Sequence, residues 1–351
     1  MIYFDPSDTE RPIGFNILEC ESDKEKFQIT EGVINMMRKM YDPNNQGFVG
    51  PIFEHSIRNA MLSVMYEPGA GFIEVVRCVT DDDYVKTLLP KIKDPIVKRY
   101  WTDEMAQTSQ QTKSDSLGYI VSKFGKFITN RLMRNIIGQS KSGFNMREAM
   151  DTQKIVLINL SKGKLGEEGS AFLGLLFVPK ILGAAMSRVD VAQEQRKPFF
   201  FYVDEFQNFA TPDFATILSE ARKYKLALTV ANQFIGQMED SVRKAVFGNV
   251  GTMVVLRTGV EDAKFLKEEM QGVFDENDII NQEKYHAYVK TIVNNEPVPP
   301  FSLDTTKDYA KHLEEKAKGA ELVKKIIEMS RLKYGRDVRF VEAEIQLRAK
   351  L

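Results

Sequence analysis

Four short, almost entirely apolar runs in the second half of the chain constrain its fold more than any other feature. They cover 155–160, 199–203, 226–231 and 253–256, and helical patterns or polar turn residues separate them. Runs of this length and composition are typical of strands that are buried on both faces of a parallel sheet covered by helices. We therefore predict an α/β fold with a mostly parallel sheet in this half of the chain.

Helical periodicity between these runs predicts helices over Glu168–Met186, Pro212–Tyr224 and Glu239–Phe247. The second of them has Thr211 as its N-cap and proline at its first position. Its inward face is predicted to consist of Phe214, Ile217, Leu218 and Ala221.

The end of the chain changes to hairpin-like alternation over Tyr285–Val293 and Val298–Leu303, with two asparagines between the runs. A charged surface helix from about Lys307 to Tyr334 and a short tail are predicted to follow.

The first half is helical in texture, from about Phe27 to Met150. Apolar residues recur at helical spacing over Ile52–Met65 and Ile120–Ile137, and Asp94–Trp101 places Ile96, Val97 and Trp101 on one side. Phe72–Val79 is ambiguous between a strand and a helix. We predict an all-helical module.

Charge and composition exclude several classes of protein. The 48 Lys and Arg balance 49 Asp and Glu, so no global basic field indicates nucleic acid or membrane. Two cysteines and three scattered histidines exclude a disulfide framework and a Cys/His zinc site. Apolar stretches such as Phe172–Met186 are shorter than a bilayer span, and the first residues do not resemble a signal peptide. A cytoplasmic protein is the default expectation.

Polar residues at the carboxyl ends of the apolar runs are the candidate site, because ligands of open parallel sheets bind there. The run 199–203 leads directly into Asp204 and Glu205. One carboxylate would hold Mg²⁺, and the next would orient and deprotonate an attacking water. The alternative is that Asp204 caps the following segment and Glu205 is solvated.

The next run ends in Asn232 and Gln233, amides that sense a terminal phosphate or, alternatively, satisfy loop backbone. Arg222 either complements a helix dipole or acts as an arginine finger on a neighbouring subunit, with Arg134 a weaker candidate. Arg257 and Thr258 end the fourth run and face either nucleotide or solvent.

The phosphate-binding signature G-x-x-x-x-G-K-[ST] is missing from the sequence. Of the two Gly-Lys pairs, Gly125-Lys126 and Gly163-Lys164, neither precedes Ser or Thr. Glu167 and Glu168 would repel phosphate, so we interpret 163–169 as a turn and helix start.

Several segments nevertheless resemble one family. FFFYVDEFQNFATPDFATILSEARKYKLALTVANQF, at Phe199–Phe234, resembles the Walker B to sensor region of TraG/TraD-type conjugative coupling ATPases. These are type IV secretion DNA pumps of the FtsK–HerA group. Tyr3–Leu18, Leu132–Gln139 and Lys154–Ser170 also look like that family.

This resemblance implies a RecA-like P-loop NTPase core interrupted by an all-α domain. The implied domains are a remnant of the motor core (1–25), an all-helical domain (26–150), the core with Walker B (151–305) and a charged helix and tail (306–351). The family uses ATP and Mg²⁺ and forms hexamers around a channel for single- or double-stranded DNA. Relaxosome or secretion-channel proteins are the implied partners, and peripheral attachment to the inner membrane is the alternative localisation.

Carried over residue by residue, the resemblance makes Asp204 the magnesium carboxylate and Glu205 the catalytic base. Gln233 becomes the sensor glutamine, which also contacts nucleotide, and Arg222 the candidate finger. The family's P-loop precedes the segment matching Tyr3–Leu18, so we expect this chain to open partway through a motor domain. Without the loop's electrostatic clamp, we expect the chain alone to hydrolyse ATP poorly or not at all.

Three hypotheses therefore remain open. The chain is part of a DNA-translocating ATPase, a non-catalytic motor subunit that serves as an interaction module, or a pilus-biogenesis or helicase-type motor. Whether it is an ATP hydrolase by itself stays undecided. Lys123, Lys126, Arg131 and Arg134 either line a channel or, as the sequence favours, form a solvated helix face.

Overall fold

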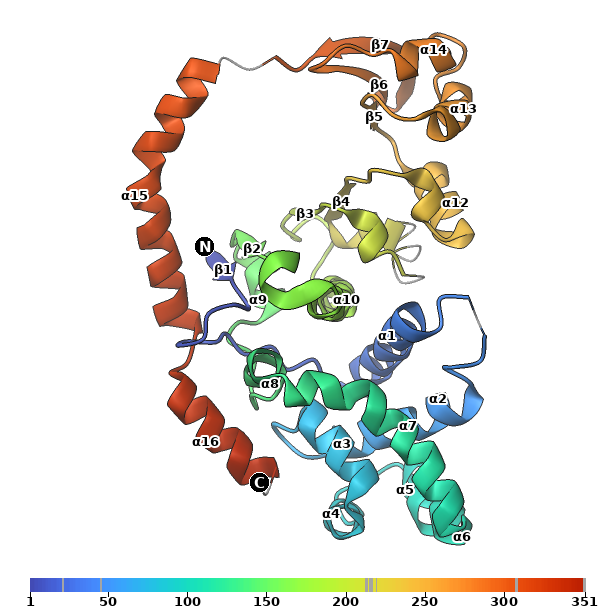
Figure 1. Cartoon of the computed structure of the whole chain (residues 1–351), viewed down its shortest axis with the longest axis vertical. Helices are drawn as coiled ribbons and strands as arrows, with labels where there is room; N and C mark the ends of the chain where they lie inside the picture. Colours follow the sequence, from blue (N-terminus) through green and yellow to red (C-terminus); the bar gives the residue numbers. More distant parts are fainter. Residues whose placement is uncertain are drawn as a thin grey trace. The chain divides into compact units, whose positions relative to one another are not determined.

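The computed structural model describes residues 1–20, 22–44, 46–211, 214, 217, 218, 220–306 and 309–349 (Figure 1). The chain divides into two compact units. Unit 1 comprises Met1–Phe199 and Lys325–Leu351, and unit 2 comprises Phe200–Lys324.

An all-helical stretch lies between two paired strands of unit 1. β1 (Ile2–Phe4) runs parallel to β2 (Val156–Ile158), with Ile2 opposite Val156 and Phe4 opposite Ile158. The helices between them are α1 (Asp23–Tyr41), α2 (Pro51–Val64), α3 (Phe72–Thr80), α4 (Asp82–Leu88), α5 (Pro95–Arg99), a π-helical turn (Tyr100–Glu104), α6 (Met105–Gln107), α7 (Gln110–Thr129), α8 (Arg131–Ile137) and α9 (Met146–Asp151). The helical module predicted from the sequence is therefore an insertion between adjacent parallel strands.

Most of the predicted helices of this module are confirmed. The structure also resolves one ambiguous segment and differs from the prediction at two places. The ambiguous segment at 72–79 is helix α3. The single helix predicted over Ile120–Ile137 is two helices, because the Asn130 side chain accepts a hydrogen bond from the Met133 N–H (3.2 Å) and starts α8. The prediction that Ile96 lies on the same side of α5 as Val97 was also wrong, because Ile96 is 75% exposed whereas Val97 is buried.

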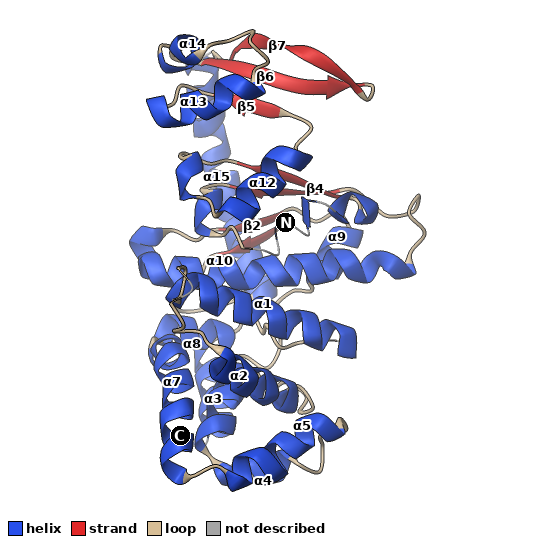
Figure 2. Cartoon of the chain, turned by 90° about the vertical axis from the view of Figure 1, so that its right-hand side faces the viewer, coloured by secondary structure: helices blue, strands red, loops and turns tan. Residues whose placement is uncertain are grey.

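α10 (Lys162–Ser187) is the core helix of unit 1, and α1 packs along it (Figure 2). Phe172 stacks on Phe127 at a centroid distance of 3.7 Å, and Phe177 lies 4.0 Å from the Phe15 ring. Gly166, with φ of 73°, interrupts the helical backbone and confirms the turn predicted at 163–169. α10 therefore joins the strands of unit 1 to its helical module.

The region that contains α10 is the one helical segment of the described chain that is long and apolar enough to cross a membrane. Its span is Lys162–Asp190, and 72% of its apolar window is buried inside the fold. Burial of this kind is typical of a core helix.

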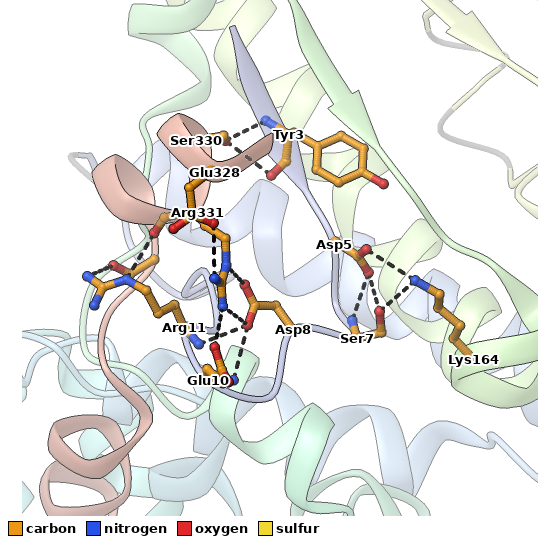
Figure 3. Close-up of polar contacts among 11 residues, drawn as sticks. Tyr3, Asp5, Ser7, Asp8, Glu10, Arg11, Lys164, Glu328, Ser330 and Arg331 are labelled. Atoms are coloured by element: carbon orange, nitrogen blue, oxygen red, sulfur yellow. Dashed lines mark hydrogen bonds and ion pairs between the residues drawn. The ribbon is translucent and has the colours of Figure 1, made fainter. Parts of the chain in front are cut away.

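The predicted charged helix is α15 (Tyr309–Tyr334), and the predicted tail forms a further helix, α16 (Val338–Ala349). At the end of α15, the Arg331 guanidinium pairs with Asp8 (2.7 Å) and Glu10 (2.8 Å) (Figure 3). Ser330 accepts a hydrogen bond from the Tyr3 N–H (2.8 Å). The last turns of α15 are therefore fixed to the amino-terminal segment by charge and hydrogen bonds.

The joint between α15 and α16 requires glycine. A Cβ on Gly335 would lie 2.3 Å from the Arg11 carbonyl oxygen and 2.7 Å from that of Arg331. Beyond this joint, Val341 and Ile345 of α16 are buried against Ile73 of α3. The charged end of the chain thus contains a hydrophobic contact with the helical module.

Glu344 of α16 makes the docking of this helix sensitive to acid. Burial alone raises the pKa of this carboxyl, but the Ser140 N–H (2.9 Å) and the Arg336 guanidinium (2.6 Å) lower it from 4.5 to about 2. Because the pKa is depressed in the fold, the contribution of Glu344 to stability is complete above about pH 4.5. It is lost as the pH falls toward 2.

We expect Glu344→Gln to reduce the free energy of unfolding at neutral pH and to flatten its decline between pH 4.5 and 2. Urea unfolding at a series of pH values measures this. Glu315→Gln, on an exposed position of α15, is the matched control. An equal decline in wild type and Glu344→Gln would contradict the prediction.

Unit 2 contains a strand pair, β3 (Phe199–Val203) and β4 (Leu226–Val230). Part of the helix predicted between these strands lies outside the described residues, namely 212, 213, 215, 216 and 219. Those that are described are helical, and Ala221–Tyr224 forms a 3-10 turn. Of the predicted inward face, Phe214, Ile217 and Ala221 are buried, whereas Leu218 is half-buried.

These strands were predicted to be buried on both faces, and the structure differs from that prediction. Residues of β3 alternate, so that Phe201 packs toward Phe214 whereas Phe200 and Tyr202 are 62% and 70% exposed. An uninterrupted apolar run does not by itself distinguish one covered face from two.

The fourth apolar run was wrongly assigned to the parallel sheet. β5 (Met253–Val255) pairs antiparallel with β6 (His286–Val293), which pairs antiparallel with β7 (Glu296–Asp304). The hairpin prediction is confirmed, and both turn residues, Asn294 and Asn295, have positive φ. The remaining helices of unit 2 are α12 (Asp240–Asn249), α13 (Val260–Glu269) and α14 (Glu276–Ile280). α13 and α14 pack on β5 through the cluster Val255, Ala263, Leu266, Met270 and Ile279 (Figure 2).

Candidate functional site

The candidate residues lie where β3 and β4 end. The Ala231 N–H donates to the Val203 carbonyl (2.9 Å), and the Phe206 N–H donates to the Ala231 carbonyl (2.9 Å). These two bonds place the carboxyl ends of the strands side by side. The structure therefore brings Glu205, with Asp204 beside it in the chain, next to Gln233.

Glu205 is the centre of this cluster. Its backbone is left-handed, with φ of 50° and ψ of 46°, which is uncommon for a residue other than glycine. Its Oε1 accepts a hydrogen bond from Gln233 Nε2, and its Oε2 accepts one from Gln207 Nε2 (2.6 Å). The half-buried carboxylate is therefore held by two neutral amides. The alternative that Glu205 is merely solvated is wrong for this structure.

Asp204 is exposed, and its Oδ1 accepts a hydrogen bond from the Glu205 N–H (3.0 Å). Mg²⁺ keeps several waters and binds through one or two carboxylates plus phosphate oxygens, so one exposed carboxylate at a strand end fits it. No group of three or more His, Cys, Asp or Glu side chains in the described part of the chain could hold a metal ion. The donor set therefore fits a phosphate-linked Mg²⁺ and not an all-protein metal cage.

The other polar residues at strand ends have local roles. Asn232 Nδ2 donates to the Phe234 carbonyl (2.6 Å), which is the loop-satisfying alternative. Thr258 Oγ1 donates to Asp262 of α13 (3.4 Å). Arg257 is exposed. These contacts place none of the three against Glu205.

Arg222 does not join the cluster within this chain. It is exposed and precedes the start of β4, whereas Gln233 follows the other end. A strand of 5 residues is roughly 16 Å long at about 3.3 Å per residue. Arg222 therefore lies at the opposite end of β4 from Gln233.

The basic residues of the helical module take part in contacts within unit 1. Lys123 is buried, 8% exposed, with its ammonium 4.4 Å from the centre of the Tyr41 ring, and burial lowers its pKa. The predicted solvated face is therefore wrong for this residue. Lys126 pairs with Glu168 (2.7 Å). Arg131 pairs with Glu342. Arg134 donates hydrogen bonds to the last carbonyls of α7.

Gln207 is the residue of this cluster that the sequence interpretation missed. It lies two positions after Glu205, in a 3-10 turn over Phe206–Asn208. The sequence carries no signal for it, because Gln207 reaches Glu205 only through the left-handed turn at that residue.

Residues 198–272 match the family model described as "TraM recognition site of TraD and TraG". This segment contains all four candidates, Asp204, Glu205, Arg222 and Gln233. Over this segment the chain is similar to TraG/TraD-type coupling proteins of conjugation and type IV secretion.

Solved structures agree in fold. The chain is similar to the bacterial conjugative coupling protein TrwBdeltaN70 in its unbound monoclinic form, with a TM-score of 0.57 and 14% identity over 87% of this chain and 74% of that one. The trigonal form in complex with sulphate gives a TM-score of 0.58, 13% identity and the same coverage.

VirB4 of Thermoanaerobacter pseudethanolicus gives a TM-score of 0.54 and 11% identity, over 89% of this chain and 78% of that one. The predicted RecA-like core, interrupted by helices, is confirmed at the level of fold. No curated protein matches the sequence.

Proposed function

We propose that this chain is the Walker B-bearing part of an ATP-driven motor that moves DNA through a conjugative or type IV secretion system. The observation that carries the proposal is the cluster of Asp204, Glu205 and Gln233 at the ends of β3 and β4, within the family segment 198–272. Two successive carboxylates and an amide are the side chains that hydrolysis of a nucleoside triphosphate needs at this edge of the sheet.

Each side chain then has one role. Asp204 holds Mg²⁺, which neutralises charge on the phosphate oxygens when it is bound. Glu205 orients the attacking water and accepts its proton. Gln233, which already contacts Glu205, senses the terminal phosphate of ATP, and Arg222 acts on the nucleotide of a neighbouring subunit. The last role requires a ring, and a homo-hexamer around a DNA channel is the assembly we propose.

The phosphate cradle is the part that the residues present do not supply. The sequence contains no Walker A signature, and Glu167 and Glu168 lie on the turn that superficially suggests one. These two carboxylates pair with Lys162 (3.1 Å) and Lys126 (2.7 Å), respectively. The ATP-binding loop must therefore come from additional residues of a longer polypeptide or from a partner chain.

We propose partners and boundaries on the same basis. The family name supports a relaxosome protein of the TraM kind as a partner of 198–272. The division into 1–25, 26–150, 151–305 and 306–351 remains our proposal for the domains. The cellular place that fits these roles is the cytoplasm, peripheral to the inner membrane.

A non-catalytic interaction module is the second candidate, and the missing Walker A signature is the observation that favours it. Such a module would bind the same partners without turnover. It has no need of two amides that hold the Glu205 carboxylate.

Steady-state hydrolysis of Mg·ATP separates the two candidates. We expect the 351-residue chain alone to show background turnover, since it lacks the loop that clamps triphosphate. The reading frame upstream of Met1 is then sequenced. A protein that includes an upstream G-x-x-x-x-G-K-[ST] loop is expected to hydrolyse ATP, and Glu205→Gln is expected to lower kcat by roughly 10²–10⁴-fold.

Turnover by the 351-residue chain alone, lost in Glu205→Gln, would contradict the requirement for an added loop. Normal turnover of Glu205→Gln in the loop-containing protein would contradict the role of this residue. A stop codon upstream with no such loop would leave the interaction module as the better candidate.

A further inference from the structure

Gln207 makes a contact to Glu205 that the proposed roles do not use. Its Nε2 lies 2.6 Å from Glu205 Oε2, while Gln233 holds Oε1 from the end of the neighbouring strand. A carboxylate only accepts hydrogen bonds, so the NH₂ groups of both amides must face it. The orientation of Gln207 is therefore fixed by chemistry, although oxygen and nitrogen look alike in a side-chain amide.

The backbone around Gln207 makes this contact a property of the turn. The left-handed conformation of Glu205 reverses the chain directly after β3 and starts the 3-10 turn that carries Gln207. Phe206, between the two, is fully buried, with its ring edge-to-face against Phe214 at 4.8 Å. The strained conformation of Glu205 is thus maintained by burial of its neighbour.

The two amides differ in burial. Gln233 is exposed, whereas Gln207 is half-buried and its Oε1 is buried with no hydrogen-bond partner among the described residues. A ligand at the strand ends can therefore draw Gln233 away from Glu205, but the position of Gln207 is set by the turn. Both donors are neutral, so they hold the carboxylate without cancelling the negative charge that a general base needs.

From these contacts we infer that Gln207 is a positioning residue that keeps the Glu205 carboxylate in its working orientation when Gln233 turns to the nucleotide. This inference rests on the proposed function for its catalytic consequence. The contact between Gln207 and Glu205 can be tested without turnover.

The first experiment uses the 351-residue chain labelled with ¹⁵N. Gln207→Leu and Gln233→Leu assign the two side-chain amide signals in the ¹H–¹⁵N spectrum. Glu205→Ala is then expected to move the Gln207 amide protons upfield, because a hydrogen bond to a carboxylate is lost. Glu261→Ala, at an exposed carboxylate of unit 2, is the matched control and should leave them in place. Unmoved Gln207 signals in Glu205→Ala would overturn the inference.

The second experiment uses the loop-containing protein described above. Gln207→Leu is expected to lower kcat by roughly 10–100-fold, as loss of a supporting hydrogen bond does at other sites, with the KM for ATP unchanged. Gln207→Met keeps a similar length without the donor and without a new charge, and it should lose the same factor. The exposed Gln237→Leu is the control. A rise in KM with unchanged kcat would mean that Gln207 supports binding and not Glu205.

The two experiments distinguish a failure of the proposed function from a failure of the inference about Gln207. If the wild-type loop-containing protein does not hydrolyse ATP, the proposed function fails, while the amide signals still decide whether Gln207 holds Glu205. If turnover depends on Glu205 but Gln207→Leu has normal kcat, the inference about Gln207 fails alone.

Discussion

Phe172→Ala is expected to destabilise unit 1 by about 3–5 kcal/mol, the usual cost of truncating a fully buried phenylalanine. The ring is 0% exposed, stacks on Phe127 and lies 6.1 Å from the Phe72 ring. Its removal leaves a cavity between α10 and the helical module, because the neighbouring rings are fixed by their own contacts. Urea unfolding followed by the fluorescence of Trp101, the single tryptophan, reports on this unit.

Phe340→Ala provides the matched control, since its side chain on α16 is 68% exposed and its truncation should change stability by no more than about 0.5 kcal/mol. Similar unfolding midpoints for Phe172→Ala and wild type would show that α10 does not form the core of unit 1.

The sequence predicted α10 well but not its role. Its apolar residues surround the helix, so the pattern indicates burial without saying which neighbours cover which side. The structure shows that Phe177 contacts Phe15 and Phe4 of the amino-terminal segment and that Phe172 contacts Phe127 of α7. Such contacts between distant residues are not encoded in local periodicity.

Strand pairing was the least predictable part of the fold. The run at 253–256 has the same apolar character as the others, yet β5 pairs with a hairpin some thirty residues later. Direction of pairing depends on which strand edge is free, and a run of four apolar residues carries no such information. The hairpin was predictable because its turn chemistry is local.

The candidate site also contains residues that could be predicted from the sequence and one that could not. Asp204 and Glu205 could be found because they follow an apolar run, and Gln233 because it follows the next one. Their contact follows from the pairing of β3 with β4. Gln207 could not be found by this rule, since it reaches Glu205 only through the left-handed turn at that residue.

The docking of α16 was also not predictable, because its charged residues favour a solvated tail when they are considered alone. In the structure these charges have partners in the helical module, and the deepest of them is Glu74, whose side chain is 5% exposed. Glu74 Oε2 accepts hydrogen bonds from the Arg348 guanidinium (2.5 Å) and from the Gly71 N–H (2.7 Å) that starts α3. Its other oxygen is buried without a partner among the described residues.

Arg348→Ala is therefore expected to lower the free energy of unfolding of unit 1 by about 3 kcal/mol, the lower end of the cost of breaking a buried ion pair. The lower end applies because Arg348 retains 20% exposure. The substitution leaves the Glu74 carboxylate buried without its cation, and it removes the donor to the Gly138 carbonyl (3.0 Å) as well. Urea unfolding measured by Trp101 fluorescence again gives the loss.

The reason for this loss is tested by a second substitution. Glu74→Gln in the Arg348→Ala background should recover part of the stability, because a neutral amide can still accept from the Gly71 N–H without a buried charge. Arg339→Ala, which breaks an exposed pair with Asp337, should change stability by less than about 1 kcal/mol. If Glu74→Gln recovers nothing, the loss comes from the packing of the Arg348 stem and not from the stranded charge.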